Sequence, residues 1–142
     1  MSVADNIKII GEAVNVAAIR AGRNPQDVKI VAATKTVKPE IINQAISEGI
    51  TAIGENRVQE LCAKIDEINH SSCEVHLIGH LQSNKIKYII DKVDLIQSVD
   101  SAELASEINK YAKKTGKVMD ILLEVNIGKE PQKHGFLPEE LL

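Results

Sequence analysis

The stretch VKIVAATKTVKP, residues 28–39, decides the fold of this chain. Its first half, 28–33, is a short and mostly apolar run, and its second half brings Lys35 and then Pro39. A short apolar run predicts a strand that is buried on both faces, as in parallel sheets covered by helices. Because proline is typical of the first turn of a helix, the stretch indicates a strand that leads into a helix and carries a lysine at its carboxyl end.

The same strand-and-helix pattern repeats along the chain. A lead-in helix is expected over 2–21, where apolar residues recur at helical spacing and Gly22 follows as a stop. The expected strand centres then recur about 18 to 27 residues apart, a spacing typical of strand–helix repeats. These centres are Val31, Ile53, Leu77, Leu95 and Leu122. Helical spacing predicts α-helices between them, over 39–48, 58–68, 84–90 and 101–115.

Strict alternation of strands and helices predicts an α/β protein with a parallel sheet and right-handed crossovers. Two architectures fit: an open doubly wound sheet and a (β/α)8 barrel of the TIM type, which takes about 250 residues for all eight strands. The last clear strand is expected over 118–126, and Asp100 with Glu103 fits the start of the helix before it. After that strand, a loop leads to the opening turn of one more helix at 137–140.

Composition limits the classes of function. The chain has 142 residues, the size of one domain, with 44% hydrophobic and 26% charged residues. Aromatic residues make up 2% and the net charge is −3 without a basic stripe, so nucleic-acid binding is not expected. The sequence shows no apolar run as long as a membrane span and no secretory leader, so a cytoplasmic protein without membrane contact is expected. Two cysteines without metal-ligand spacing fit a reducing compartment.

Polar side chains follow every expected strand. In a curled parallel sheet these exits meet at one mouth, the end at which chemistry collects. Lys35 follows the first strand, and we expect it to pack against Val31, Ala33 and Val37. Such apolar neighbours would favour the neutral, nucleophilic amine that forms a Schiff base with an aldehyde. A solvated lysine just past a strand is the alternative interpretation, and position alone does not separate the two.

Other exit residues have structural interpretations beside functional ones. His76 is expected to pack within a strand, too far from His80 along that strand for the two to share a metal ion. His80, Ser83 and Asn84 follow a glycine turn at the start of the next helix, where they could hold an anion or a cofactor ring, or simply cap that helix. Glu55 and Arg57 are expected to form an ion pair at the mouth. Lys133 is either a basic group near the mouth or a loop lysine.

Four motifs, in order along the chain, resemble the YggS/PROSC family of pyridoxal-phosphate-binding proteins of vitamin B6 homeostasis. They are VAATKTVKPEIINQAISEG (31–49), IGENRVQE (53–60), HLIGHLQSNK (76–85) and VNIGKEPQKHGF (125–136). Any one of them would be a weak signal, but four in the right sequence are a strong one. The resemblance covers essentially the entire chain.

The resemblance implies a barrel like the N-terminal barrel of alanine racemase, without the added β domain of the racemase. Residues 1–142 would form one barrel domain that binds pyridoxal 5′-phosphate (PLP), covers about the first five strands and is incomplete at its C-terminal end. The resemblance further implies that Lys35 holds PLP as an internal aldimine and that Asn56, in the GENR motif, lines the cofactor site. The implied role is to carry and buffer PLP with little or no catalytic turnover.

Two alternatives to a PLP carrier stay open. One is a PLP-dependent racemase or decarboxylase, which the resemblance disfavours because such enzymes need catalytic groups from a second domain or a partner subunit. The other is a cofactor-free module that binds another protein through the barrel.

Members of the resembled family are longer than this chain. Their remaining part would supply the last three strands, a glycine- and serine-rich phosphate cradle and an arginine near the pyridine nitrogen. We therefore expect weaker PLP binding by this chain, which looks like a fragment or a truncated product. An intact member is expected to be a monomer, whereas the open sheet edges of this chain predict either self-association or a lost remainder.

Overall fold

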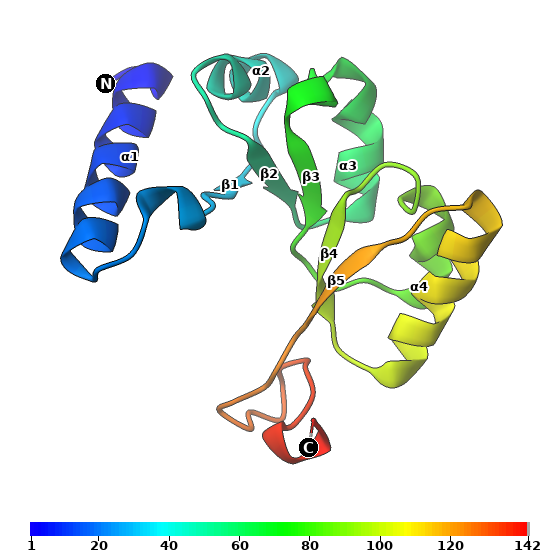
Figure 1. The fold of residues 1–142 in the computed structure, drawn as a ribbon. Helices are drawn as coiled ribbons and strands as arrows, with labels where there is room; N and C mark the ends of the chain where they lie inside the picture. The colour runs from blue at the N-terminus through cyan, green and yellow to red at the C-terminus, as the bar shows by residue number, and fades with distance from the viewer. Residues whose placement is uncertain (142) are drawn as a thin grey trace.

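A single parallel sheet organises the chain, of which the computed structural model describes residues 1–141 (Figure 1). Its five strands lie side by side in the order in which they follow along the chain. They are β1 (Ala32–Ala33), β2 (Ala52–Glu55), β3 (Glu74–Leu77), β4 (Leu95–Val99) and β5 (Asp120–Leu123). A doubly wound sheet reverses its strand order at a switch point, so the observed order excludes that architecture. The prediction of an α/β barrel type, represented here by five strands, is confirmed.

Helices of two kinds connect the strands. The α-helices are α1 (Val3–Arg20), α2 (Pro39–Ser47), α3 (Val58–Lys64) and α4 (Ala102–Thr115). The 3-10 helices are η1 (Pro25–Asp27), η2 (Ile65–Glu67), η3 (His70–Ser72), η4 (Ser83–Tyr88) and η5 (Pro138–Glu140). The local sequence explains where α1 begins and where α4 ends. At the start of α1, Ser2 Oγ accepts a hydrogen bond from the Asp5 amide. At the end of α4, Gly116 has a φ of +68°, which stops the helix. Within residues 1–141, no helix combines the length and the apolar character that a membrane crossing needs.

Two of the helix predictions are wrong. The segment after β3 forms the 3-10 helix η4 instead of an α-helix, and the Ile89 amide donates to the carbonyl of Ile86 three residues earlier. Residues three apart eclipse each other on a 3-10 helix, so this short element is enough to bury both isoleucines in the core. At the start of α4, Ser101 and not Asp100 is the capping residue, since its Oγ accepts the Leu104 amide at 3.2 Å. Asp100 therefore has its carboxylate available for other contacts.

The two faces of the sheet differ in chemistry. The parallel register pairs Ile53 with Val75 and Gly54 with His76, so these two pairs lie on opposite faces. The first pair is fully buried in an apolar core that α2, α3 and α4 complete. Strand alternation places polar side chains on the other face, namely Glu74, His76 and Gln97. The sheet thus has an apolar face under the helices and a more polar face opposite it.

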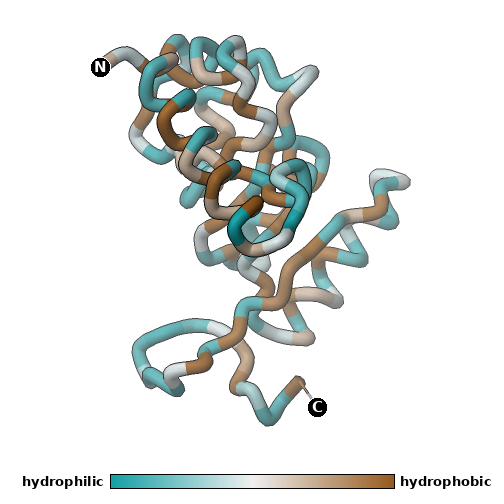
Figure 2. The backbone as a smooth tube through the Cα atoms, turned by 60° about the vertical axis from the view of Figure 1, so that its left-hand side comes forward, coloured by the Kyte–Doolittle hydropathy of each residue, from teal (hydrophilic) through white to brown (hydrophobic). Residues whose placement is uncertain are grey.

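The two edges of the sheet leave apolar surface exposed. In β5, Leu122 and Leu123 are 51% and 47% exposed, and Figure 2 shows this apolar segment running out toward the C-terminal loop. At the other edge, a cavity of about 630 Å³ separates α1 from the β1 side of the sheet, and Ile7 and Val14 are among its apolar lining residues. Self-association through these open edges stays a prediction.

The close approach of the β2 and β3 exits generates a stability prediction. A Cβ atom at Gly79 would lie 2.2 Å from the carbonyl oxygen of Asn56, a backbone atom that cannot swing away. We expect Gly79→Ala to lower the free energy of unfolding by at least ~1–3 kcal/mol, the usual cost of overpacking. The measurement is urea denaturation followed by circular dichroism. The control is Gly11→Ala inside α1, where no atom lies within 4 Å and where alanine should instead stabilise by ~0.5–1 kcal/mol. Equal stability of Gly79→Ala and the wild type would contradict the packing of these two exits.

Candidate functional site

Lys35 lies at the carboxyl edge of the sheet, in the turn between β1 and α2. The next residue, Thr36, has a positive φ of 63°, which turns the chain sharply after the strand. The Lys35 side chain is exposed, and Ala33 is exposed as well. Of the two interpretations of Lys35, this exposure favours the solvated lysine just past a strand. The structure presents an accessible primary amine at the mouth.

Hydrogen bonds to β2 fix the turn that carries Lys35. The Thr34 amide donates to the carbonyl of Gly54 at 2.9 Å and continues the β1–β2 ladder beyond the strand. The Thr34 hydroxyl is buried and donates to Glu55 Oε1. The Val37 amide then donates back to the Thr34 carbonyl at 3.0 Å and closes the turn around Lys35.

A buried cation, Lys64 of α3, holds the same turn from the helix side. Its Nζ donates to the carbonyls of Thr34 at 2.9 Å and Val37 at 3.3 Å, and it lies 2.8 Å from Glu55 Oε1 and 3.2 Å from Glu60 Oε1. The side chain of Lys64 is 9% exposed and that of Glu55 is fully buried. Four oxygens around one ammonium compensate the loss of water that burial causes. The charge pair therefore links β1, β2 and α3 beneath the lysine turn.

Glu60 completes this network on its solvent side. Its Oε1 accepts the backbone amide of Thr36, the residue with positive φ. This backbone hydrogen bond, assisted by Lys64, lowers the pKa of Glu60 below its usual value. A carboxyl whose pKa is lowered by folding stabilises the fold at neutral pH, and that contribution is lost as the pH falls through the folded-state pKa. The shape of the lysine turn is thus tied to an ionised Glu60.

Asn56 follows β2 at the same edge of the sheet, directly beside the exit of β3. It is half buried, and its backbone carbonyl oxygen is the atom for which Gly79 leaves room. The Ser98 hydroxyl donates to the Gly79 carbonyl at 2.6 Å, so the exits of β2, β3 and β4 are joined in sequence. Lys35 and Asn56 accordingly follow neighbouring strands, as predicted. Their roles in binding stay predictions.

The structure corrects one predicted ion pair and places two other residues. Glu55 pairs with Lys64 and not with Arg57, because the side chain of Glu55 points toward α3, away from the solvent that Arg57 reaches. His76 is 1% exposed and packed within β3, as predicted, where its Nε2 lies 2.8 Å from Glu74 Oε2. Lys133 pairs with Glu130 at 2.6 Å inside the loop after β5.

The prediction from sequence missed the Lys64 network. Lysine side chains in helices are ordinarily solvated, so the residue type alone did not indicate that Lys64 is buried. Its position did carry a signal, since Lys64 lies three residues after Leu61 and next to Ile65, both fully or nearly fully buried. A lysine on the apolar face of a short helix indicates an ion pair that is at least partly buried. Glu60, four residues earlier on the same helix, is in position to be one acidic partner.

Comparisons with known proteins agree on the family to which this chain is similar. The sequence model of the family described as the alanine racemase N-terminal domain matches residues 13–142. A protein from Aquifex aeolicus named pyridoxal phosphate homeostasis protein is 43% identical over 141 residues, which are 99% of this chain and 62% of that relative. The protein of the same name from Escherichia coli K12 is 32% identical over 98% of this chain and 61% of its own length.

A solved structure with the same fold comes from Bifidobacterium adolescentis. That protein, described as unknown, superposes with a TM-score of 0.91 at 36% identity, over 98% of this chain and 60% of the other. PipY from Synechococcus elongatus, solved with PLP bound, superposes with a TM-score of 0.74 at 32% identity, over 93% of this chain and 60% of PipY. The chain therefore spans about 60% of the length of these proteins.

Removal of the buried cation tests the network under Lys35. We expect Lys64→Met to lower the free energy of unfolding by ~3–5 kcal/mol, because Glu55 is left buried and unpaired. The control is Lys110→Met, which removes a lysine that pairs with Glu107 on the exposed face of α4 and should cost at most ~1 kcal/mol. Urea denaturation of both variants gives the comparison. Similar losses in the two variants would show that the buried pair has no special weight.

Proposed function

Because this chain belongs to the family of alanine racemase N-terminal domains, we propose that it binds PLP through the side-chain amine of Lys35. Its role is to carry and buffer PLP in vitamin B6 homeostasis, with little or no catalytic turnover. The names of the relatives from Aquifex aeolicus and Escherichia coli support this role, since they refer to homeostasis and not to an enzyme. The PLP-bound structure of PipY supports the choice of ligand. Both cysteines are free, which fits the proposed cytoplasmic location.

The observation that carries this proposal is the presentation of Lys35. PLP supplies an aldehyde that reacts reversibly with primary amines. The amine of Lys35 is exposed at the mouth of the sheet, where a planar ligand can approach it, and the chemistry of the group fits the reaction. An exposed lysine on a loose loop would meet the same chemical requirement, so the fixed backbone around Lys35 is the more specific support.

The residues of the chain orient the amine before any ligand arrives. Lys64 binds the carbonyls on both sides of Lys35, those of Thr34 and Val37, and Glu60 binds the amide of Thr36. These contacts hold the turn and leave the Lys35 side chain as its free part. Fixing the attachment point in advance reduces the conformational entropy that binding would otherwise cost. Asn56, at the exit of the adjacent strand, lines the proposed position of the ligand.

The first prediction of this proposal concerns the site of attachment. Titration of the chain with PLP should produce the visible absorption band of PLP bound to an amine, and borohydride reduction followed by peptide mass mapping should place the adduct on Lys35. Lys35→Ala should lose both signals. The control is Lys38→Ala, which removes an exposed lysine from the same turn region and should keep them. An adduct that persists at Lys38 in the Lys35→Ala chain, with unchanged affinity, would contradict the assignment.

A second prediction separates the carrier from a racemase or decarboxylase, with which this fold is shared. With PLP added, the chain should racemise L-alanine and decarboxylate amino acids no faster than free PLP does. Chiral chromatography and carbon dioxide release measure the two rates. A rate well above that of free PLP, abolished by Lys35→Ala, would establish the enzyme instead of the carrier.

A further inference from the structure

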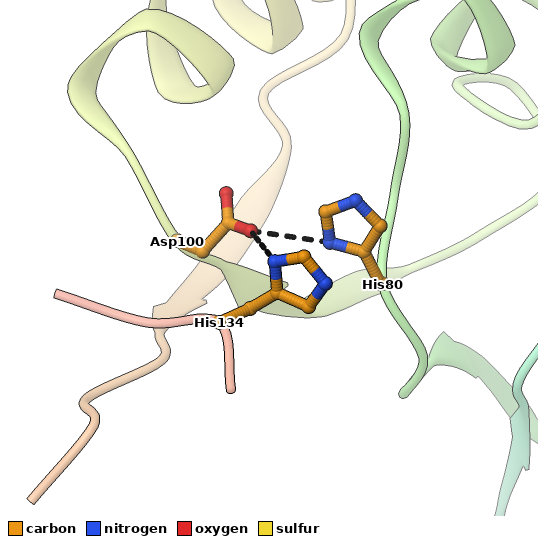
Figure 3. A group of neighbouring side chains, drawn as sticks. All are labelled: His80, Asp100 and His134. Carbon is orange, nitrogen blue, oxygen red and sulfur yellow. Dashed lines mark ion pairs between the residues drawn. The ribbon is translucent and has the colours of Figure 1, made fainter. Parts of the chain in front are cut away.

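Three side chains with metal-binding chemistry meet at the mouth, apart from the Lys35 turn. Figure 3 shows that His80, Asp100 and His134 point toward one another from three different segments. We propose that they bind one divalent transition-metal ion of the zinc type, with water in the remaining coordination position. This inference concerns a different ligand and different residues from the proposed PLP site, and it does not depend on that function.

The spacing of the ligand atoms fits one ion. Asp100 Oδ2 lies 3.1 Å from His80 Nδ1 and 3.7 Å from His134 Nδ1, and the possible ligand atoms of the three residues all lie within 4.8 Å of one another. In a tetrahedral zinc site with bonds of about 2.0–2.2 Å, neighbouring ligand atoms are about 3.3–3.6 Å apart. The two distances to Asp100 bracket that value.

The backbone places both histidines, so their meeting does not depend on chance side-chain positions. His80 follows Gly79, where a Cβ atom would lie 2.2 Å from the Asn56 carbonyl oxygen. His134 precedes Gly135, which has φ of +112° and where a Cβ atom would lie 2.8 Å from the Asn126 nitrogen. Each histidine is therefore adjacent to a position at which the backbone leaves room only for glycine.

The loop that carries His134 is closed at its base. Asn126 donates its amide to the carbonyl of Phe136 at 2.8 Å, and Phe136 donates its amide to the carbonyl of Glu124 at 2.8 Å. The Asn126 side chain also donates to the Glu130 carbonyl at 2.9 Å and accepts the Glu130 amide at 3.1 Å. These bonds bring His134 back from the loop to the exit of β4, where Asp100 lies.

The chemistry of the three ligands selects the class of ion. Two imidazole nitrogens and one carboxylate oxygen suit zinc and its neighbours in the transition series, whereas Mg²⁺ and Ca²⁺ prefer oxygen ligands. The Asp100 side chain is 13% exposed, so its negative charge is partly shielded from water and is available to a cation. Because Ser101 caps α4, Asp100 has no structural task at the helix start.

Binding requires one change in the histidine pair. The two rings are stacked, with centroids 3.9 Å apart and 12° between their planes, so their nitrogen lone pairs do not yet converge on a single point. A rotation of the His134 ring about its side-chain bonds would bring its lone pair toward the other two ligand atoms, and that side chain is 59% exposed. The proposed site is thus preformed in its backbone and completed by one ring rotation.

Equilibrium dialysis of the chain against Zn²⁺, with metal content measured by atomic emission, tests the proposal. We expect one bound ion, and Co²⁺ should give the visible bands of a four-coordinate site. His134→Ala and Asp100→Asn should each weaken Zn²⁺ binding by at least ~10–100-fold, the loss already seen when only an outer partner of a ligand is removed. His70→Ala, which removes an exposed histidine from η3, should bind like the wild type.

Two outcomes would overturn the metal site. One is a wild-type chain, folded by circular dichroism, that retains no Zn²⁺. The other is Zn²⁺ binding that is the same in the wild type, in Asp100→Asn and in His134→Ala. The variant Lys35→Ala separates this proposal from the PLP proposal, because it should lose the PLP adduct and keep the bound ion.

Discussion

The lysine turn depends on one buried ion pair, between Lys64 and Glu55. The two side chains are 9% and 0% exposed, so the burial of each charge depends on the other, and the pair holds only while β2 and α3 keep their relative positions. Two carbonyls of the turn accept the remaining protons of the ammonium. One cation therefore fixes the exit of β1, the exit of β2 and the face of α3 together. The position of the exposed Lys35 amine therefore depends on the Lys64–Glu55 ion pair, in which Lys35 takes no part.

The periodic features of the fold could be predicted from the sequence, and the features that depend on single contacts could not. Regular spacing of apolar runs predicted five strands in a parallel sheet, because burial imposes that spacing, and the family resemblance then indicated the barrel type. The sequence left a packed and a solvated Lys35 as alternatives, because position after a strand does not decide which way a side chain turns, and the structure shows the exposed one. The 3-10 form of η4 was missed for a similar reason, since Ile86 and Ile89 satisfy both helical periods.

For the candidate site residues too, the sequence predicted the features that follow from a motif and missed those that depend on single contacts. The motifs predicted that Lys35 and Asn56 follow neighbouring strands, which the parallel register confirms. The meeting of His80, Asp100 and His134 involves residues up to 54 positions apart, and it depends on two glycine turns whose tight contacts are visible only in three dimensions. A parallel sheet gathers all its exits at one edge, so residues without any pattern along the chain become neighbours there.

The sequential order of the strands has a consequence for how the chain is made. Each strand pairs with the strand that precedes it along the chain, so no pairing requires a segment that is synthesised much later. The segment between two successive partners is one helical crossover, so its closure costs less entropy than a pairing with a more distant segment would. The growing sheet can thus be extended unit by unit as the ribosome releases the chain, with the Lys64–Glu55 pair complete once α3 has emerged.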